Sequence, residues 1–135
     1  MKFRKLHLLF GILLFSSRIY SQSCSPSMLV GIWKATSSDS TSSMIFKDEK
    51  TINIIYKNKN VIFHYAINNI NNECILSMQQ TGRDSTSIIF SKLKMSNTDN
   101  FNLEYYLLKN YNTKTGVWEE MNLPPGSIAY FIRSK

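Results

Sequence analysis

The sequence predicts an all-β domain of eight short antiparallel strands that follows an N-terminal signal peptide. Three observations predict this fold class. Beyond residue 24, apolar and polar residues alternate repeatedly with a period of two, and no stretch of more than ten residues has the period of a helix. Gaps of two to five residues, rich in Asn, Ser, Asp and Gly, separate the alternating stretches and are typical of hairpins. The 135 residues suffice for one well-buried core but not for two.

Residues 1–21 have the composition of an export signal. Three basic residues within the first five positions precede the uninterrupted apolar run 8–15, and serines follow it. This run is too short for a membrane-spanning helix, which needs about 20 apolar residues. We therefore expect residues 1–21 to be removed, and residues 22–135 to form one secreted or periplasmic domain. Cleavage after Ser21 or after Ser23 is compatible with the small residues that the peptidase requires.

The net charge of the expected mature domain is lower than that of the whole chain. The whole chain carries 16 Lys and Arg against 9 Asp and Glu, which gives a net charge of +7. Four of the basic residues lie within residues 1–21, so 12 basic and 9 acidic residues remain and the net charge falls to +3. The remaining basic residues form no long cluster, and we expect no nucleic-acid partner.

Two cysteines, Cys24 and Cys74, lie in the expected mature domain. Export would carry them to a compartment where thiols are commonly oxidised, so we expect an intrachain disulfide. Two alternatives stay open: lipidation of Cys24, which would anchor the domain to a bacterial membrane, and two unpaired thiols with Cys74 buried. Ser21 stands where a lipidation signal usually has an aliphatic residue. Two cysteines and one histidine after residue 21 do not make a zinc motif, and we expect no metal or cofactor.

Each expected strand is bounded by residues that turn the chain. Short polar side chains bond to the local backbone and tolerate positive φ, as in Asn-Lys-Asn at 58–60, Gly-Arg-Asp at 82–84 and the Asn-rich segment 97–100. Leu-Pro-Pro-Gly at 123–126 is expected to turn into the last strand. In chain order, the predicted strands span residues 30–38, 43–47, 51–57, 61–68, 74–80, 85–92, 102–109 and 127–133.

The alternation separates one apolar from one polar face. Within 61–67, the apolar and aromatic residues at odd positions share a face, and His64 lies on the other. Within 101–107, the face with Phe, Leu and Tyr alternates with one that carries Asn102 and Glu104. Eight short strands with one inward face can close into a barrel or form a two-sheet sandwich, and the strand pattern alone leaves both open.

The beginning and the end of the strand region carry a family resemblance. The segment 29–34 reads Leu-Val-Gly-Ile-Trp-Lys, so Gly31 and Trp33 form a Gly-x-Trp motif, and Arg133 lies on the last predicted strand. Together with the export signal and the strand rhythm, these residues resemble the lipocalin-like families, in particular small exported lipocalin-like proteins of bacteria. The resemblance implies an eight-stranded up-and-down barrel, plugged by a short helical turn at 25–27, with Arg133 packed across Trp33. The chain departs from typical lipocalins because it lacks a C-terminal helix and their Thr-Asp-Tyr-like turn.

The resemblance implies that the barrel holds a small apolar ligand. The same inward-facing side chains could instead fill the barrel completely. A filled barrel would favour the alternative function, a non-enzymatic envelope-interaction or inhibitor-like module that binds through its surface. Trp118, in the connection 110–126, is expected to cover the barrel, and its alternative role is to anchor a protein partner. The residues expected to line a ligand pocket are Ile52, Ile54, Phe63, Tyr65, Met78, Phe90, Leu103 and Tyr105.

Catalysis has little support in the sequence. His64 is the sole histidine after residue 21, and the chain contains no Gly-x-Ser-x-Gly nucleophile motif. The acidic pairs 48–49 and 119–120 are adjacent in sequence, so their side chains are expected to point apart, unlike the facing carboxylates of a glycosidase. We therefore expect a binding protein that is not an enzyme.

Overall fold

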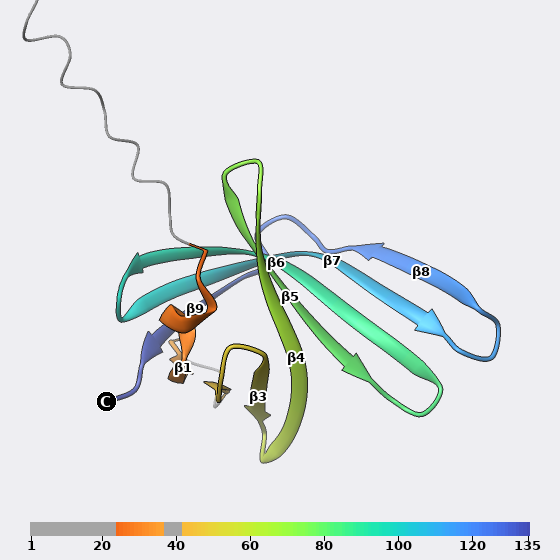
Figure 1. Cartoon of the computed structure of the whole chain (residues 1–135), viewed down its shortest axis with the longest axis horizontal. Helices are drawn as coiled ribbons and strands as arrows, with labels where there is room; N and C mark the ends of the chain where they lie inside the picture. Colours follow the sequence, from red (N-terminus) through yellow and green to blue (C-terminus); the bar gives the residue numbers. More distant parts are fainter. Residues whose placement is uncertain (1–23, 37–41) are drawn as a thin grey trace, which may run out of the picture.

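The computed structural model describes residues 24–36 and 42–135 and shows a closed antiparallel β-barrel (Figure 1). The expected signal peptide 1–21 and the end of the first predicted strand, residues 37–38, lie outside the described residues. The elements in chain order are the 3-10 helix η1 (Pro26–Leu29) and the strands β1 (Gly31–Ala35), β2 (Ser43–Phe46), β3 (Thr51–Tyr56), β4 (Lys59–Ile70), β5 (Glu73–Thr81), β6 (Ser85–Asn97), β7 (Asn100–Asn112), β8 (Val117–Asn122) and β9 (Ile128–Arg133).

Eight of these strands form the barrel. Each strand from β1 to β7 pairs antiparallel with the next along the chain, and β9 pairs with both β7 and β1 and so closes the ring. This confirms the predicted all-β, up-and-down barrel and excludes the two-sheet sandwich. Closure matters physically because it leaves the ring without unpaired edges that could pair with other chains.

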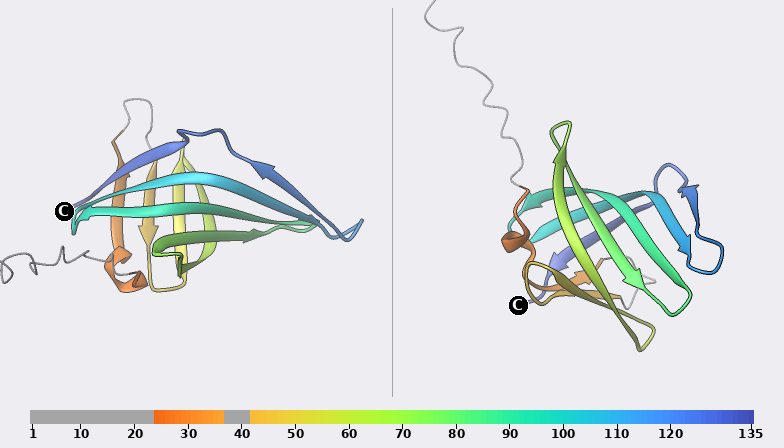
Figure 2. Two further views of the ribbon diagram at one scale, coloured as in Figure 1. Left: turned by 90° about the horizontal axis from the view of Figure 1, so that it is seen from above. Right: turned by 45° about the vertical axis from the view of Figure 1, so that its right-hand side comes forward.

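Strand β8 is the one described strand that the sequence did not predict. The prediction placed residues 110–126 in a connection, whereas β8 pairs with residues 107–112 of β7. Strand β9 pairs with the other half of β7, residues 100–104. The outer halves of β6 and β7, together with β8, therefore extend past the barrel as a sheet (Figure 2). All six residues of β8 are exposed, so the strand has no buried face. Apolar and polar residues therefore do not alternate along it, and the pattern that predicts a strand is missing.

Asparagines make some of the turns but also continue the strands. Lys57 and Asn58 have φ values of 46° and 63°, and Asn71 and Asn72 have 52° and 64°, which suit tight two-residue hairpin turns. The turn between the predicted strands 61–68 and 74–80 and the turn predicted at 97–100 are both shorter than expected, because β4, β6 and β7 run into them. Hydrogen bonding along the ladders outweighs the low strand propensity of Asn there.

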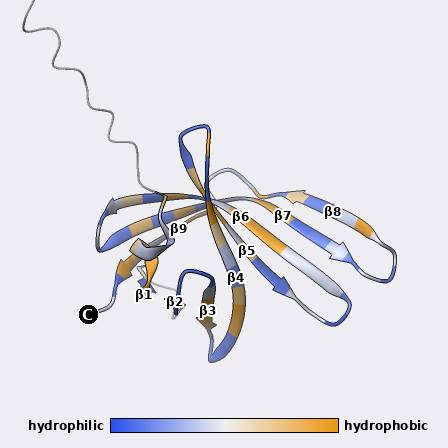
Figure 3. Cartoon of the chain, viewed as in Figure 1, coloured by the Kyte–Doolittle hydropathy of each residue, from blue (hydrophilic) through white to orange (hydrophobic). Residues whose placement is uncertain are grey.

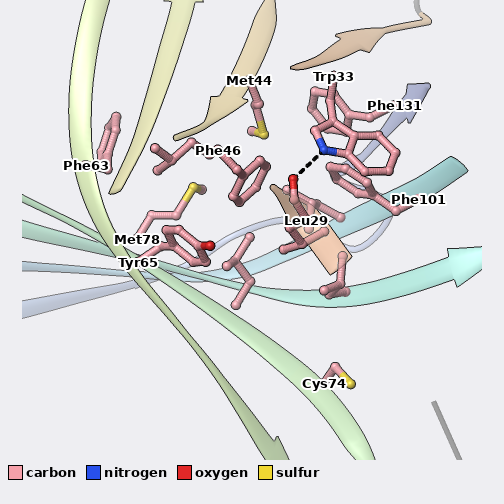
Figure 4. Packing of buried hydrophobic residues seen from close by; sticks show 14 residues of the cluster. Leu29, Trp33, Met44, Phe46, Phe63, Tyr65, Cys74, Met78, Phe101 and Phe131 are labelled. Carbon is pink, nitrogen blue, oxygen red and sulfur yellow. Dashed lines mark hydrogen bonds between the residues drawn. The ribbon is translucent and has the colours of Figure 1, made fainter. Parts of the chain in front are cut away.

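The apolar core fills one end of the barrel (Figure 4). Hydrophobic and hydrophilic residues alternate along strands such as β4, which places one face inward (Figure 3). The rings of Trp33 and Phe101 lie 4.5 Å apart between centroids, and those of Phe101 and Phe131 lie 5.0 Å apart. The indole Nε1 of Trp33 donates a hydrogen bond of 2.7 Å to the carbonyl oxygen of Leu29. Since Leu29 and Trp33 are both fully buried, η1 plugs this end.

The predicted disulfide between Cys24 and Cys74 is confirmed. It connects the segment just before η1 with β5, across 50 positions in sequence. Because the Cys24 sulfur is bonded to Cys74, it is not available for the thioether of a lipid anchor, and neither described cysteine is a free thiol. A disulfide is compatible with an oxidising compartment. Among the described residues, no helix has the length and apolar character needed to cross a bilayer.

Candidate functional site: a cavity in the open half of the barrel

A cavity of about 530 Å³ occupies the half of the barrel that the core leaves unfilled. Its lining residues come from the ends of β1 and β3 that lie away from η1, from β2, from the middle of β5, β6 and β7, from β9, and from the connections before β2 and after β8. Nearly all of them are apolar or aromatic, and none carries a charge. The lining consists of Ala35, Ser42, Met44, Ile54, Tyr56, Met78, Ile89, Tyr105, Leu108, Leu123, Ile128, Ala129, Tyr130 and Phe131.

The change from core to cavity follows from residue size along two neighbouring strands. Residues two positions apart in a strand share a face, so Ala35 is the next inward-facing residue after Trp33 on β1. In the same way, Ala129 is the inward-facing neighbour of Phe131 on β9. Trp33 and Phe131 are buried and fill their layer, whereas two alanine methyl groups leave the next layer partly empty. The small side chains of β1 and β9 therefore create much of the hollow.

Three of the residues predicted to line a pocket do line this cavity: Ile54, Met78 and Tyr105. Ile52 and Leu103 share faces with Ile54 and Tyr105 but lie one layer deeper, fully buried in the core. The alternation of apolar residues assigned these side chains to the correct face of each strand. It carries no information about their depth along the barrel, which depends on the register between strands.

The other three predicted lining residues lie elsewhere. Phe63 and Tyr65 belong to the core, and the Tyr65 hydroxyl donates a hydrogen bond of 2.7 Å to the backbone carbonyl of Asp48. Phe90 does not line the cavity: it borders a shallow outer hollow of about 230 Å³ beside His64, and its neighbour Ile89 faces inward. Because residues 88–90 are all apolar, alternation could not decide which of them points inward.

Several lining residues escaped the sequence-based prediction. Tyr56 follows Ile54 on the inward face of β3, so an extension of the alternation would have found it. Leu108 could not be found in this way because the pairing of β6 with β7 shifts between Phe90 and Ser91, and the shift breaks the period of two. Leu123 lies in the connection after β8, a strand that the prediction lacked.

Tyr105 is a partly buried polar residue of the cavity wall. Burial raises the pKa of its hydroxyl from 10.0 to about 12, so the group is protonated and uncharged at neutral pH. Burial also raises the pKa of Tyr65 to about 12, with smaller contributions from the nearby charges of Asp48 and Glu49. The cavity is therefore electrically neutral over the physiological pH range.

The Gly-x-Trp motif and Arg133 lie at the opposite, filled end. The guanidinium carbon of Arg133 lies 4.2 Å from the centre of the Trp33 ring, and the same guanidinium donates hydrogen bonds of 2.8 Å to the carbonyls of Met28 and Val30. Gly31 has a φ of +134°, and a Cβ on it would lie 2.8 Å from Nη1 of Arg133. These residues hold the plug in place and do not line the cavity.

Trp118 does not cover the barrel, contrary to expectation. It lies on β8, outside the cavity lining, with its ring centroid 5.0 Å from that of Tyr111, and 49% of it is exposed. The strand β8 pairs with the part of β7 that extends past the barrel, so Trp118 belongs to this extension and not to the ring of strands. The sequence-based prediction failed because it had no strand to fix the position of this residue.

Comparison of the chain with protein-family models, with curated proteins and with solved structures gave no match. Within residues 24–36 and 42–135, no group of three or more His, Cys, Asp or Glu side chains is arranged to hold a metal ion.

Proposed function

We propose that this protein is an exported, lipocalin-like binding protein that holds one small apolar molecule in the open half of its barrel. The observation that carries the proposal is the cavity of about 530 Å³ with an uncharged, mostly apolar lining. Its size falls within the range of roughly 300–1,000 Å³ that is common for ligand sites. The expected role is binding without catalysis and without a cofactor.

Two further features support this proposal. The contact between Arg133 and Trp33, beside Gly31, is the arrangement that the resemblance to lipocalin-like proteins implies. The disulfide and the apolar, signal-like segment 8–15 support export to a secreted or periplasmic location. The protein would then meet its ligand outside the cytoplasm.

A variant that fills the cavity tests the proposal. Ala129→Phe places an aromatic ring where the wall of the cavity is now a methyl group. We expect the purified protein to bind a neutral solvatochromic dye such as Nile red saturably at one site, and the variant to bind it at least about tenfold more weakly. The measurement is a fluorescence titration, followed by competition with retinoids and fatty acids.

Ala66→Phe is the matched control, because Ala66 is exposed on the outer face of β4. Its dye affinity should equal that of the unmodified protein. Unfolding curves establish that both variants are folded. A titration that does not saturate, or equal dye affinity in the Ala129→Phe variant, would contradict binding in the cavity.

The exposed strand β8 favours a second function, that of a module that binds a protein through its surface. Val117, Trp118 and Met121 are each about half exposed on this strand, and aromatic residues dominate the energetics of protein interfaces. Trp118→Ala separates the two functions. Dye binding in the cavity should be unchanged in this variant, whereas binding through the β8 surface should be lost.

A further inference from the structure

The polar groups of the cavity are few and lie at different depths. The side chain of Tyr56 follows Ile54 on the inward face of β3, is 47% exposed and lies towards the mouth, whereas Tyr105 is partly buried in the wall. On β7, Tyr105 is the inward-facing residue next to Leu103, which is fully buried in the core. Of the tyrosines that line the cavity, Tyr105 is thus the one that lies next to the core along its strand.

This hydroxyl has no hydrogen-bond partner among the residues that the structure describes. The buried Tyr65 is different, since its hydroxyl donates to the carbonyl of Asp48. In the described part of the chain, Asn53 Oδ1 is the one fully buried side-chain oxygen or nitrogen without a partner. The Tyr105 hydroxyl is therefore not enclosed by protein but open to the cavity.

A ligand that enters the cavity displaces the water that can bond to Tyr105. If the ligand is a pure hydrocarbon, the hydroxyl loses its partner and binding is weakened by the cost of an unmade hydrogen bond. If the inner end of the ligand carries an acceptor oxygen, this cost disappears. The hydroxyl is protonated at neutral pH and can act as a donor, and burial raises its pKa further, to about 12.

A charged group at the inner end of the ligand would be poorly accommodated. None of the lining residues is a Lys, Arg or His, so a carboxylate beside Tyr105 would be buried without a counter-charge. A basic residue does lie beside Tyr56: the ammonium of Lys57 is 5.1 Å from the centre of the Tyr56 ring. A fatty acid could place its carboxylate near the Lys57 ammonium only if the carboxylate lay at the mouth and the hydrocarbon chain lay inside the cavity.

We propose that the cavity selects an uncharged, largely hydrocarbon molecule that carries a carbonyl oxygen at its inner end, and that the Tyr105 hydroxyl donates a hydrogen bond to this oxygen. The inference rests on the proposed function, because it names the ligand class of the same cavity. Met78 and Ile54 surround the hydrocarbon part of the ligand, and Tyr105 fixes its orientation.

The test compares three probes of equal chain length: a long-chain methyl ketone, the n-alkane and the fatty acid. Each competes with Nile red for the purified, disulfide-bonded protein and for two variants, Tyr105→Phe and Tyr106→Phe. Tyr106 is the control, because it does not line the cavity and its ring packs against Phe90. We expect the ketone to bind about tenfold more tightly than the alkane. Tyr105→Phe should abolish this preference, and Tyr106→Phe should retain it.

Infrared spectroscopy of the bound ketone gives a second readout that does not depend on a variant. A hydrogen bond from Tyr105 should shift the carbonyl stretch to a lower frequency than in hydrocarbon solvent, and Tyr105→Phe should reverse the shift. An unshifted carbonyl in the unmodified protein would overturn the inference even if the variant did not fold.

The outcomes separate the two proposals. Equal affinity for ketone and alkane, or a fatty acid that binds most tightly and is insensitive to Tyr105→Phe, would overturn the role of Tyr105 and leave binding in the cavity intact. Failure of all three probes and of the dye to bind would instead overturn the proposed function.

Discussion

At the scale of single residues, Arg133 joins the chain segments that meet at the filled end of the barrel. Its guanidinium donates to the carbonyls of Met28 and Val30 around the plug, and Nε donates to the carbonyl of Thr98 in the turn before β7. The same group lies over the Trp33 ring. The planar guanidinium group carries several N–H donors in fixed directions and can make all these contacts at once. The single ammonium of a lysine cannot do so.

We expect Arg133→Lys to lower the free energy of unfolding by about 2–3 kcal/mol, because it loses charge-assisted hydrogen bonds to backbone carbonyls. Urea unfolding followed by tryptophan fluorescence measures the change. Arg83→Lys, in the exposed turn between β5 and β6, is the control and should leave the midpoint unchanged. Equal midpoints for Arg133→Lys and Arg83→Lys would contradict this account.

Asp48 organises the turn between β2 and β3. Its Oδ1 accepts hydrogen bonds from the backbone N–H groups of Lys50 and Thr51, at 2.7 Å and 2.6 Å. These two bonds, that of Lys50 first, hold the pKa of the Asp48 carboxyl below its ordinary value of 3.8. The folded protein therefore binds this proton less readily than the unfolded chain does.

The lowered pKa of Asp48 predicts a loss of stability in acid. Its contribution is fully present above the ordinary pKa of 3.8 and is lost as the pH falls through the lower pKa of the folded state. We expect the urea midpoint of the unmodified protein to fall between about pH 4 and pH 2, and that of Asp48→Asn to fall less steeply over this window. Parallel curves for the two proteins would show that Asp48 contributes nothing to the pH dependence.

At the scale of elements, β7 owes its length to two partners on one edge. Its first half pairs with β9 as part of the barrel, and its second half pairs with β8 outside the ring. The register shift between Phe90 and Ser91 on β6 lies near this change of partner. A bulge increases the local bend of a strand, which is consistent with an outer half that extends past the barrel (Figure 2).

The plug η1 depends on contacts with the rest of the protein. It has only four residues, and no side chain caps its N-terminus at Ser25. Leu29 anchors it from within the core, and the Cys24–Cys74 disulfide anchors the preceding residue to β5. A helix this short would not form alone.

Removal of the disulfide is expected to lower the free energy of unfolding by about 4 kcal/mol, since the bridge spans 50 positions and restricts the unfolded chain. The variant with both Cys24→Ser and Cys74→Ser, compared with the unmodified protein in urea, measures this change. Reductant should destabilise the unmodified protein and leave the double variant unaffected. If full reduction left the midpoint of the unmodified protein in place, the bridge would not be a stabilising feature.

At the scale of the whole molecule, the barrel is filled at one end and hollow at the other. The filled end combines the aromatic rings of Trp33, Phe101 and Phe131, whereas Ala35 and Ala129 leave room in the next layer. One barrel of this size can therefore contain both a stabilising core and a cavity. The two interpretations of the inward-facing residues, core and pocket, apply to different layers of the same strands.

The amino-acid sequence by itself determined what depends on neighbours along the chain. The alternation predicted the strands other than β8 and the inward faces of most of them, and the polar separators predicted most of the turns. The motif pair Gly31 and Trp33 indicated the barrel through its resemblance to lipocalin-like proteins. Only the tertiary structure decided that β8 pairs with β7, that Phe90 faces outward, and which inward residues line a cavity. These features depend on the register between strands, which joins residues far apart in sequence and leaves no local pattern.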